Sequence, residues 1–198
     1  NGETGTTASF TFRAWDQSSG IVATKVDTSS NGGISAFSAN TEVASITVSD
    51  VNDAPEITGG PGNVGLTETD TGLTASSTFT ITDVDTTDSV VAAVDSVTVG
   101  GTGAASVPGA LDNATLKSFL SVSPTAILDN TQTSATLTWD FNSGAEAFNF
   151  LAAGETLVLT YTVSATDDDG TPLSDTENVT VTITGTNDGP NVFVDTGD

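Results

Sequence analysis

The residues of this chain that could do chemistry are carboxylates gathered in three short segments. "DVNDAP" begins at Asp50, "DVDTTD" begins at Asp83, and "DDDG" begins at Asp167. Carboxylate and amide oxygens at this density are ligands of hard cations such as Ca²⁺, which takes six to eight of them. The predicted chemistry is therefore calcium binding, with these residues as ligands: Asp50, Asn52, Asp53, Asp83, Asp85, Asp88, Asp167, Asp169 and, more weakly, Asp168.

The composition narrows the choice of partner. The chain contains no Cys, His or Met, which excludes disulfides and the usual zinc, copper and haem sites. Its 26 acidic residues face three basic ones, for a net charge of −23, and no basic residue lies in the three acidic segments. This charge predicts no nucleic-acid partner. No apolar run is long enough for a membrane-spanning helix, so direct membrane insertion is not expected.

Catalysis is the alternative use of paired carboxylates. Asp140 is adjacent to Trp139, and an acid beside a sugar-stacking ring is an arrangement that a glycosidase could use. Strict alternation in "LTWDFN", however, directs Trp139 to the core and Asp140 to the outer face. There is no His or Cys for acid–base or thiol chemistry, and no Gly-x-Ser-x-Gly motif. The sequence predicts that the protein is not an enzyme.

The acidic segments must be positioned by strands, because period-two alternation dominates the chain. A helical pattern is confined to residues 111–122, where Asp112 or Asn113 is a possible N-cap, and to one turn within 145–156. We expect an all-β protein of tandem Ig-like or cadherin-like antiparallel β-sandwiches, with one or two short helices in connections. The expected strands are residues 8–15, 42–49, 64–67, 76–84, 94–101, 134–141, 156–165 and 177–184.

An internal repeat sets the domain boundaries. Residues 41–55 match residues 176–190 at a constant offset, and both copies end in Asn-Asp-x-Pro. Proline ends a strand and stiffens the passage that follows. We therefore predict that residues 1–50 are the last strands of an incomplete domain, 51–55 a linker, 56–185 a complete sandwich, and 186–198 a second linker with the start of a further domain. Upstream strands or another chain would complete residues 1–50, because a lone hairpin is marginally stable.

Topology brings the acidic segments together. In a sandwich, the loops after the second and penultimate strands return to the end at which the chain arrives. The loops at 83–88 and 167–169 should therefore meet the linker there. Left unpaired, each close pair of carboxylates would repel by about 1 kcal/mol in water. Glu68, after the first strand, is predicted as a further ligand, whereas Asp70 beside it is weaker because its turn can lie at the other end.

Three motifs carry a resemblance that covers nearly the whole chain. "LTETDTGLTASSTFTITDVDTTDS", "FNFLAAGETLVLTYTVSATDDDGT" and "ENVTVTITGTNDGP" resemble, in this order, a VCBS-type repeat of giant RTX-class bacterial adhesins. Asp50 with its tetrad looks like the Asp-x-Asn-Asp linker of bacterial cadherin-like domains, where calcium rigidifies the joint. At the second joint Gly185 replaces that Asp, so the resemblance implies weaker calcium binding by Asn187 and Asp188.

The resemblance implies an extracellular extender, secreted or at the bacterial cell surface, that holds distal ligand-binding domains away from the cell for attachment or biofilm formation. Its partners would be neighbouring repeats of the same chain. Two alternatives remain open at this point: a filament subunit completed by strands from other copies, and a module that binds a glycan or protein directly.

Overall fold

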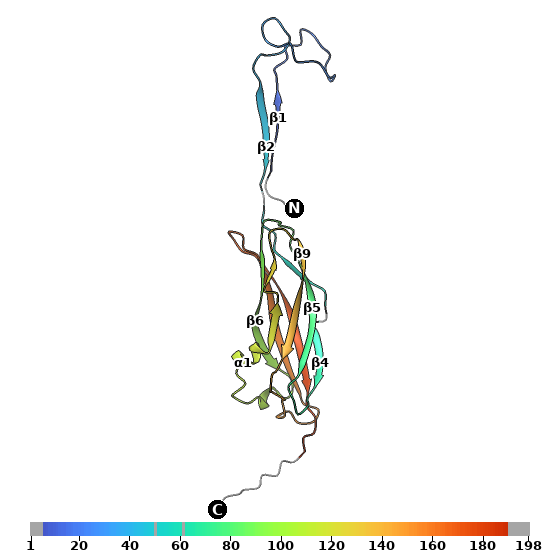
Figure 1. Cartoon of the computed structure of the whole chain (residues 1–198), viewed down its shortest axis with the longest axis vertical. Coiled ribbons are helices and arrows are strands. Elements are labelled where there is room, and N and C mark those ends of the chain that lie inside the picture. Colours follow the sequence, from blue (N-terminus) through green and yellow to red (C-terminus); the bar gives the residue numbers. More distant parts are fainter. Residues whose placement is uncertain (1–5, 50, 61, 190–198) are drawn as a thin grey trace, which may run out of the picture. The chain divides into compact units, whose positions relative to one another are not determined.

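The computed structural model describes residues 6–49, 51–60 and 62–189, which fall into two compact units. The first unit is a hairpin with a long loop. The second is a β-sandwich that begins at the linker, residues 51–55 (Figure 1). The predicted all-β fold is confirmed.

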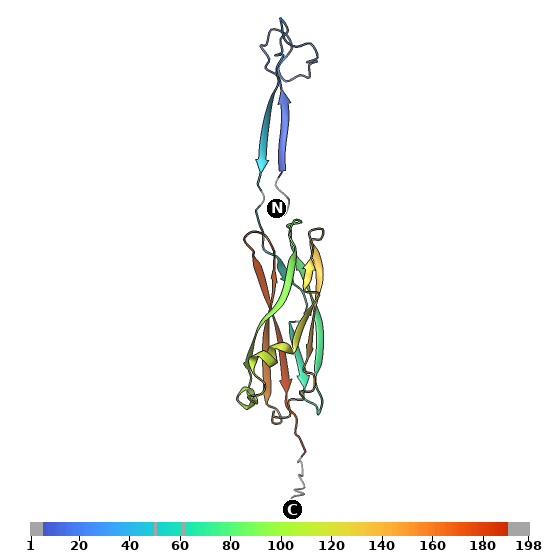
Figure 2. The same cartoon turned by 60° about the vertical axis from the view of Figure 1, so that its left-hand side comes forward.

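Two sheets make up the sandwich (Figures 1 and 2). The five-stranded sheet has the order β4-β11-β10-β6-β8, and the four-stranded sheet has the order β3-β5-β9-β7. The strands are β3 (Glu56–Thr58), β4 (Asn63–Thr67), β5 (Thr74–Thr82), β6 (Val90–Gly100), β7 (Leu120–Ser123), β8 (Ala126–Leu128), β9 (Ser134–Asn142), β10 (Thr156–Thr166) and β11 (Ser174–Thr184).

Alternation along the strands builds the core. On β9, Leu137, Trp139 and Phe141 are at most 1% exposed, while Asp140 between them is exposed, as the sequence predicts. On β10 the alternate residues from Leu157 to Val163 are fully buried. The inner faces of the two sheets therefore interdigitate as the faces of a sandwich do.

One strand pair departs from the predicted antiparallel arrangement. β4 runs parallel to β11, with Thr67 opposite Thr184. The chain reaches this position by leaving the four-stranded sheet after β3 and joining the five-stranded sheet as β4. Gly60 lies in this crossing with φ of +69°, and a Cβ there would collide with the carbonyl oxygen of Thr78. The crossing therefore requires glycine.

The helical predictions are right in part. α1 (Asn113–Ser118) is capped by Asp112, whose side chain accepts a hydrogen bond of 2.8 Å from Thr115 N. The predicted helix extends too far, because residues from Leu120 onward form β7. The turn expected within 145–156 is not helical; a 3₁₀ turn, η1 (Ala104–Ser106), forms elsewhere. In these connections, packing against the core decides the conformation rather than the local pattern.

The first unit consists of β1 (Thr6–Phe12), β2 (Glu42–Val48) and the loop between them. The loop is tied at its base, where Trp15 bridges to Phe37 and the Arg13 guanidinium donates a 2.8 Å hydrogen bond to Ser38 O. Every residue of the two strands is exposed to solvent except Ala44 on β2, whose exposure is intermediate. The hairpin therefore has no core of its own.

Candidate metal centre

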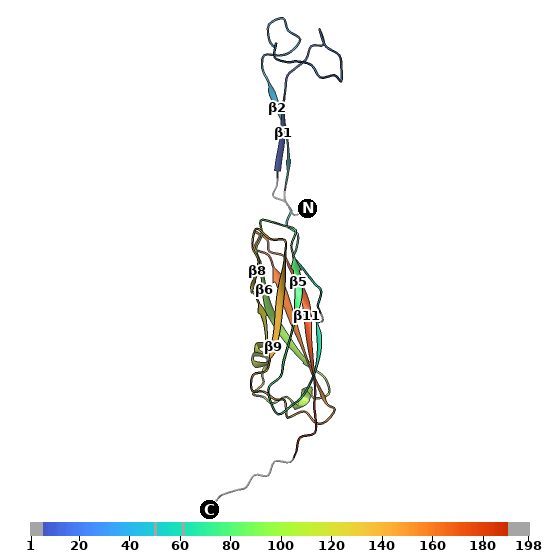
Figure 3. The ribbon, with the colours of Figure 1, turned by 45° about the vertical axis from the view of Figure 1, so that its right-hand side comes forward.

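Three acidic segments that are distant in sequence meet at one end of the sandwich, which we call the linker end. Asp53 N donates to Asp85 Oδ2 at 2.6 Å, which joins the linker to the β5–β6 loop. Asn52 Nδ2 donates to Asp167 Oδ2 at 3.2 Å, which joins the linker to the β10–β11 loop. The two loops lie at the same end of the sandwich in Figures 1 and 3.

Strand pairing explains why the two loops adjoin. β6 and β10 are neighbours in the five-stranded sheet, with Val91 opposite Thr166. The β5–β6 loop ends where β6 begins, and the β10–β11 loop begins where β10 ends. The two loops also bond directly, because Ser89 N and Oγ donate to the Asp168 carboxylate at 2.8 and 2.6 Å.

Each loop is held in shape by its own aspartates. Asp85 N donates to Asp83 Oδ1 at 2.9 Å, and Asp88 N donates to Asp85 O at 3.2 Å. In the other loop, Leu173 N donates to Asp167 Oδ1 at 3.0 Å. The bonds to Asp83 and Asp167 are local side-chain-to-main-chain bonds of the kind that Asp makes in turns, and the bond from Asp88 N to Asp85 O closes a main-chain turn.

The carboxylates at the linker end are buried and only partly satisfied. Asp83, Asp85 and Asp167 are each 3% exposed and Asp88 is 8% exposed. A buried carboxylate without compensating partners is costly. Four buried oxygens have no hydrogen-bond partner: Asn52 Oδ1, Asp83 Oδ2, Asp85 Oδ1 and Asp88 Oδ2.

The raised pKa values of Asp83 and Asp88 reflect burial and repulsion among the carboxylates at the linker end. Burial raises the pKa of Asp83, and the charges of Asp85, Asp167 and Asp53 raise it further, against a hydrogen bond from Asp85 N that lowers it. Burial also raises the pKa of Asp88, as do the charges of Asp85, Asp167 and Asp169. These groups therefore interact as one cluster, whose net charge opposes full ionisation.

The remaining predicted calcium ligands differ from the buried carboxylates in their exposure to solvent. Asp168 is exposed, and its bonds to the Ser89 side chain and backbone lower its pKa. Asp169 is exposed at the tip of the same loop. Asp50, predicted as a ligand, lies outside the described residues. The centre therefore consists of buried carboxylates from the two loops and of the linker residues that reach them.

The carboxylate and amide oxygens at the linker end are suitable ligands for a hard cation. They are not yet arranged around a single position. In the part of the chain that the structure describes, no three acidic side chains are already arranged to hold a metal ion. Calcium would therefore need side-chain rotation or oxygens outside that set, such as Asn52 Oδ1 and main-chain carbonyls. The unpartnered oxygens are of the required type, and the linker and the two loops contain no basic residue to compete with a cation.

Glu68 does not belong to this centre, which corrects the sequence-based prediction. Its N–H donates to Thr184 O at 2.9 Å, and its Oε2 accepts from Thr186 N at 3.1 Å. β11 spans eleven residues between the β10–β11 loop and Thr184, or about 33 Å at the usual rise per residue. The reason for the error is the parallel pairing of β4 with β11, which takes residue 68 to the opposite end, here called the far end.

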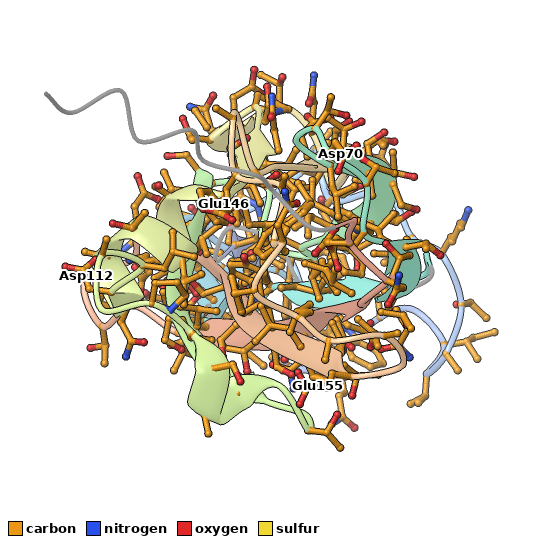
Figure 4. The ribbon with its side chains drawn as sticks, turned by 90° about the horizontal axis from the view of Figure 1, so that it is seen from below. Asp70, Asp112, Glu146 and Glu155 are labelled. Carbon is orange, nitrogen blue, oxygen red and sulfur yellow. The ribbon has the colours of Figure 1, made fainter. Side chains whose placement is uncertain are left out.

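The far end has its own acidic group. Glu68 is 2% exposed and its Oε1 has no partner. Burial raises the pKa of Glu68, as do the charges of Asp188 and Asp70, while the bond from Thr186 N lowers it. Figure 4 views the sandwich from this end, with Asp70 labelled. Asn187 and Asp188, predicted as weaker ligands, are exposed beside this group.

Steric crowding at the far end requires glycine at position 185. A Cβ at this position would lie 2.7 Å from Leu151 Cβ and would collide with the carbonyl oxygen of Ala152. The backbone of Gly185 is also bonded on both sides, to Glu155 O and from Gly154 N. Position 185, the equivalent of Asp50 in the repeat, therefore cannot carry an aspartate without movement of the 151–155 turn.

Sequence reasoning missed three groups at the linker end. Ser89 links the two loops, Thr171 O accepts from Asn52 Nδ2 at 3.3 Å, and Asp175 Oδ2 accepts from Ile57 N at 2.8 Å. None of these three groups belongs to a recognisable sequence motif. They can therefore be identified only from the way in which the loops and strands pair in the structure.

Comparison with known proteins gives no family assignment. No protein-family profile matches the chain, and no curated protein matches it. Among solved structures, it is similar to the PapD-like domain 7 of human CEP192, at 16% identity and TM-score 0.39 over 70% of this chain and 89% of that one. It is also similar to the CooA pilin subunit of enterotoxigenic Escherichia coli, at 10% identity and TM-score 0.42 over 69% and 100%.

Among the described residues, no helix has the length and apolar character needed to cross a membrane.

Proposed function

We propose that this chain is a non-catalytic extender module of a large secreted or cell-surface bacterial adhesin, stiffened by calcium at its joints. In this role the sandwich is a spacer that holds other domains in position, and it catalyses no reaction. The proposal joins the chemistry of the linker end with the resemblance to VCBS-type and bacterial cadherin-like repeats.

One observation carries the proposal. Four buried oxygens from the linker and the β5–β6 loop have no partner, in a cluster of carboxylates that repel one another. Calcium would supply the missing positive charge and coordinate the oxygens that hydrogen bonds leave free. Asn52, Asp83, Asp85, Asp88 and Asp167 would hold it, with Asp50, Asp53 and Asp169 as further donors.

Hydrogen bonds already fix the linker to the sandwich, which is what a stiff joint requires. Asp53 N is bonded to Asp85, Pro55 is buried, and Ile57 N is bonded to Asp175. An ion bound by both loops and the linker would add a restraint of the same kind. Without the ion, repulsion among the carboxylates would weaken it.

A second and weaker site is part of the proposal. At the far end, Glu68 Oε1 is buried without a partner, and the charges of Asp70 and Asp188 act on it. Asn187 adds an amide oxygen. This group has fewer buried carboxylates than the linker end, and Gly185 supplies no side chain, so its affinity for calcium should be lower.

Calorimetry of the 198-residue chain tests the proposal. Calcium at about one hundred times its dissociation constant would raise the free energy of unfolding by about 2.7 kcal/mol. For a unit of this size that corresponds to an increase in Tm of about 5–10 °C. Magnesium at the same concentration should do less, because it demands a smaller octahedral site.

Hydrogen exchange of the linker tests the stiffening separately. The amide of Asp53 should exchange more slowly with calcium than with chelator, while amides in the middle of β9 should be unchanged. Superimposable melting curves with calcium and with chelator would refute the proposed site. A calcium-dependent Tm with unchanged exchange at Asp53 would refute the stiffening alone.

A further inference from the structure

The hairpin of the first unit exposes a continuous apolar face. Phe10, Phe12 and Ile46 are 65%, 46% and 67% exposed. The opposite face is polar apart from Val43, and on it the Thr7 and Thr47 hydroxyls lie 3.2 Å apart. A two-stranded hairpin is marginally stable alone, and an exposed apolar patch marks a surface that something covers. The apolar residues of this face are Ala8, Phe10, Phe12, Ala44, Ile46 and Val48, and Thr6 and Glu42 lie at its two ends.

The strand register identifies the equivalent hairpin in the sandwich. In β1–β2, Phe10 is opposite Ala44; in β10–β11, Tyr161 is opposite Val179. If 151 is added to each residue number in β1 and 135 to each residue number in β2, every β1–β2 pair becomes a pair found in β10–β11. The same shift of 151 places Asp16 on Asp167. The repeat seen in sequence is therefore also a repeat of strand pairing.

In the sandwich, the equivalent apolar residues are completely covered. The residues that correspond to the six apolar residues of β1–β2 are all 0% exposed: Leu159, Tyr161, Val163, Val179, Val181 and Ile183. The rings of Phe141 on β9 and Tyr161 lie 6.3 Å apart. The edges are also paired, because β6 runs antiparallel along β10 and β4 runs parallel along β11.

Every strand that covers or flanks β10–β11 precedes it in sequence, between residues 56 and 142. The same order applied to β1–β2 places the covering strands before residue 6. The sandwich of a second copy would fit less well, because the inner faces of its two sheets already pack against each other in their own core. Two copies would also each carry a charge of −23, which opposes association.

We propose that the apolar face of β1–β2 is the inner surface of another sandwich, completed by strands that lie N-terminal to residue 6 in the same polypeptide. One of these strands would pair antiparallel along β1 and another parallel along β2. A facing sheet would place an apolar side chain in the hollow of about 220 Å³ between Phe10 and Ile46. This inference rests on strand register and exposure, and it is independent of calcium.

Hydrogen exchange tests the inference on two proteins. One is the 198-residue chain, and the other is the natural polypeptide extended upstream by about one hundred residues, as many as separate Glu56 from Thr156. In the 198-residue chain, peptides from β1 and β2 should exchange at least 100-fold faster than those from β10 and β11. In the extended protein, the two hairpins should exchange at similar rates. Continued fast exchange of β1 and β2 there, or a gene without upstream strands, would overturn the inference.

A matched pair of variants on β1 identifies the face that is covered. In the extended protein, Phe10→Asp should abolish protection of β1 and β2, whereas Thr11→Asp on the polar face should preserve it. Sedimentation of the unmodified 198-residue chain tests the competing occupant. A stable dimer that Phe10→Asp dissociates would show that a second copy covers the face, and would overturn the inference.

Discussion

Asp53 N donates a 2.6 Å hydrogen bond to Oδ2 of Asp85, a residue 32 positions away in the β5–β6 loop. The bond uses one oxygen of a carboxylate whose other oxygen, Oδ1, is buried without a partner. Asp85 is therefore committed to the linker and still has a free coordination position. In the proposed function, this combination would couple the position of the linker to the binding of a cation.

Substituting Asp83 should separate the stability of the metal-free protein from its response to calcium. Asp83→Asn removes one charge from the cluster but keeps the side-chain oxygen that accepts from Asp85 N. In chelator, we expect the variant to be more stable than the wild type by about 1 kcal/mol, the scale of one close carboxylate repulsion, or by about 2–4 °C in Tm. In calcium, it should lose most of the calcium-dependent increase.

Asp140→Asn is the control for this experiment, because Asp140 is exposed on the outer face of β9. It removes the same charge from the chain and should leave both melting temperatures within about 1 °C of the wild type, since surface substitutions usually have small effects. Equal effects of the two variants would mean that only net charge matters, and would contradict a specific centre.

The pH dependence of the metal-free protein should follow the raised pKa values of Asp83 and Asp88. The folded state binds these protons more tightly than the unfolded state. Their contribution to the free energy of unfolding is therefore present at low pH and is lost as pH rises through the folded-state pKa. Relative to the wild type, an Asp83→Asn/Asp88→Asn double variant should gain stability between about pH 4 and pH 7. Urea denaturation in chelator across this range measures the difference.

Calcium should reverse this dependence, because it binds the ionised carboxylates and competes with protons. The increase in Tm caused by calcium should therefore shrink on acidification toward about pH 4. An increase that is constant with pH would indicate ligands other than carboxylates.

Glu68→Gln should affect only the far end. The amide keeps an oxygen for the bond from Thr186 N but removes the charge that acts with Asp70 and Asp188. In calorimetric titration with calcium, the weaker binding event should disappear while the tighter one is unchanged. Glu56→Gln is the matched control, since Glu56 is exposed on β3. Loss of the tighter event in Glu68→Gln would contradict the separation of the two sites.

Gly185→Asp should fail to create a stronger second site, even though it restores the residue found at the first joint. The new Cβ would collide with the Ala152 carbonyl oxygen and crowd Leu151. We expect a loss of about 1–3 kcal/mol in the free energy of unfolding, as for other overpacking substitutions. Gly189→Asp, where a Cβ meets nothing within 4 Å, is the control. A stable Gly185→Asp variant with tighter calcium binding would contradict the steric argument.

The hydroxyl of Tyr161 offers a test of the core that is independent of metal. Tyr161 is fully buried and donates to Leu116 O at 2.9 Å, so it joins β10 to α1. Tyr161→Phe should lower the free energy of unfolding by about 1 kcal/mol, the usual net value of one buried hydrogen bond. Burial also raises the pKa of the Tyr161 phenol, so its ionisation should not appear in an absorbance titration before the protein unfolds. An unchanged urea midpoint in Tyr161→Phe would show that the bond adds nothing.

The sequence by itself determined the features that depend on short-range patterns. Period-two alternation places Trp139 inside and Asp140 outside because consecutive side chains of a strand point to opposite faces. The acidic loops after β5 and β10 were likewise visible, since polar residues that follow an alternating run mark the end of a strand. The repeat between residues 41–55 and 176–190 was also visible, because the same residue types recur at a constant offset.

Tertiary structure decided the features that depend on which strands become neighbours. The parallel pairing of β4 with β11 moved Glu68 to the far end, and packing turned Leu120–Ser123 into β7 rather than the end of a helix. The steric need for Gly185 comes from the 151–155 turn, which no local pattern connects to it. These outcomes follow from contacts between distant residues, whose free energy outweighs local propensity and is not encoded in any single stretch of sequence.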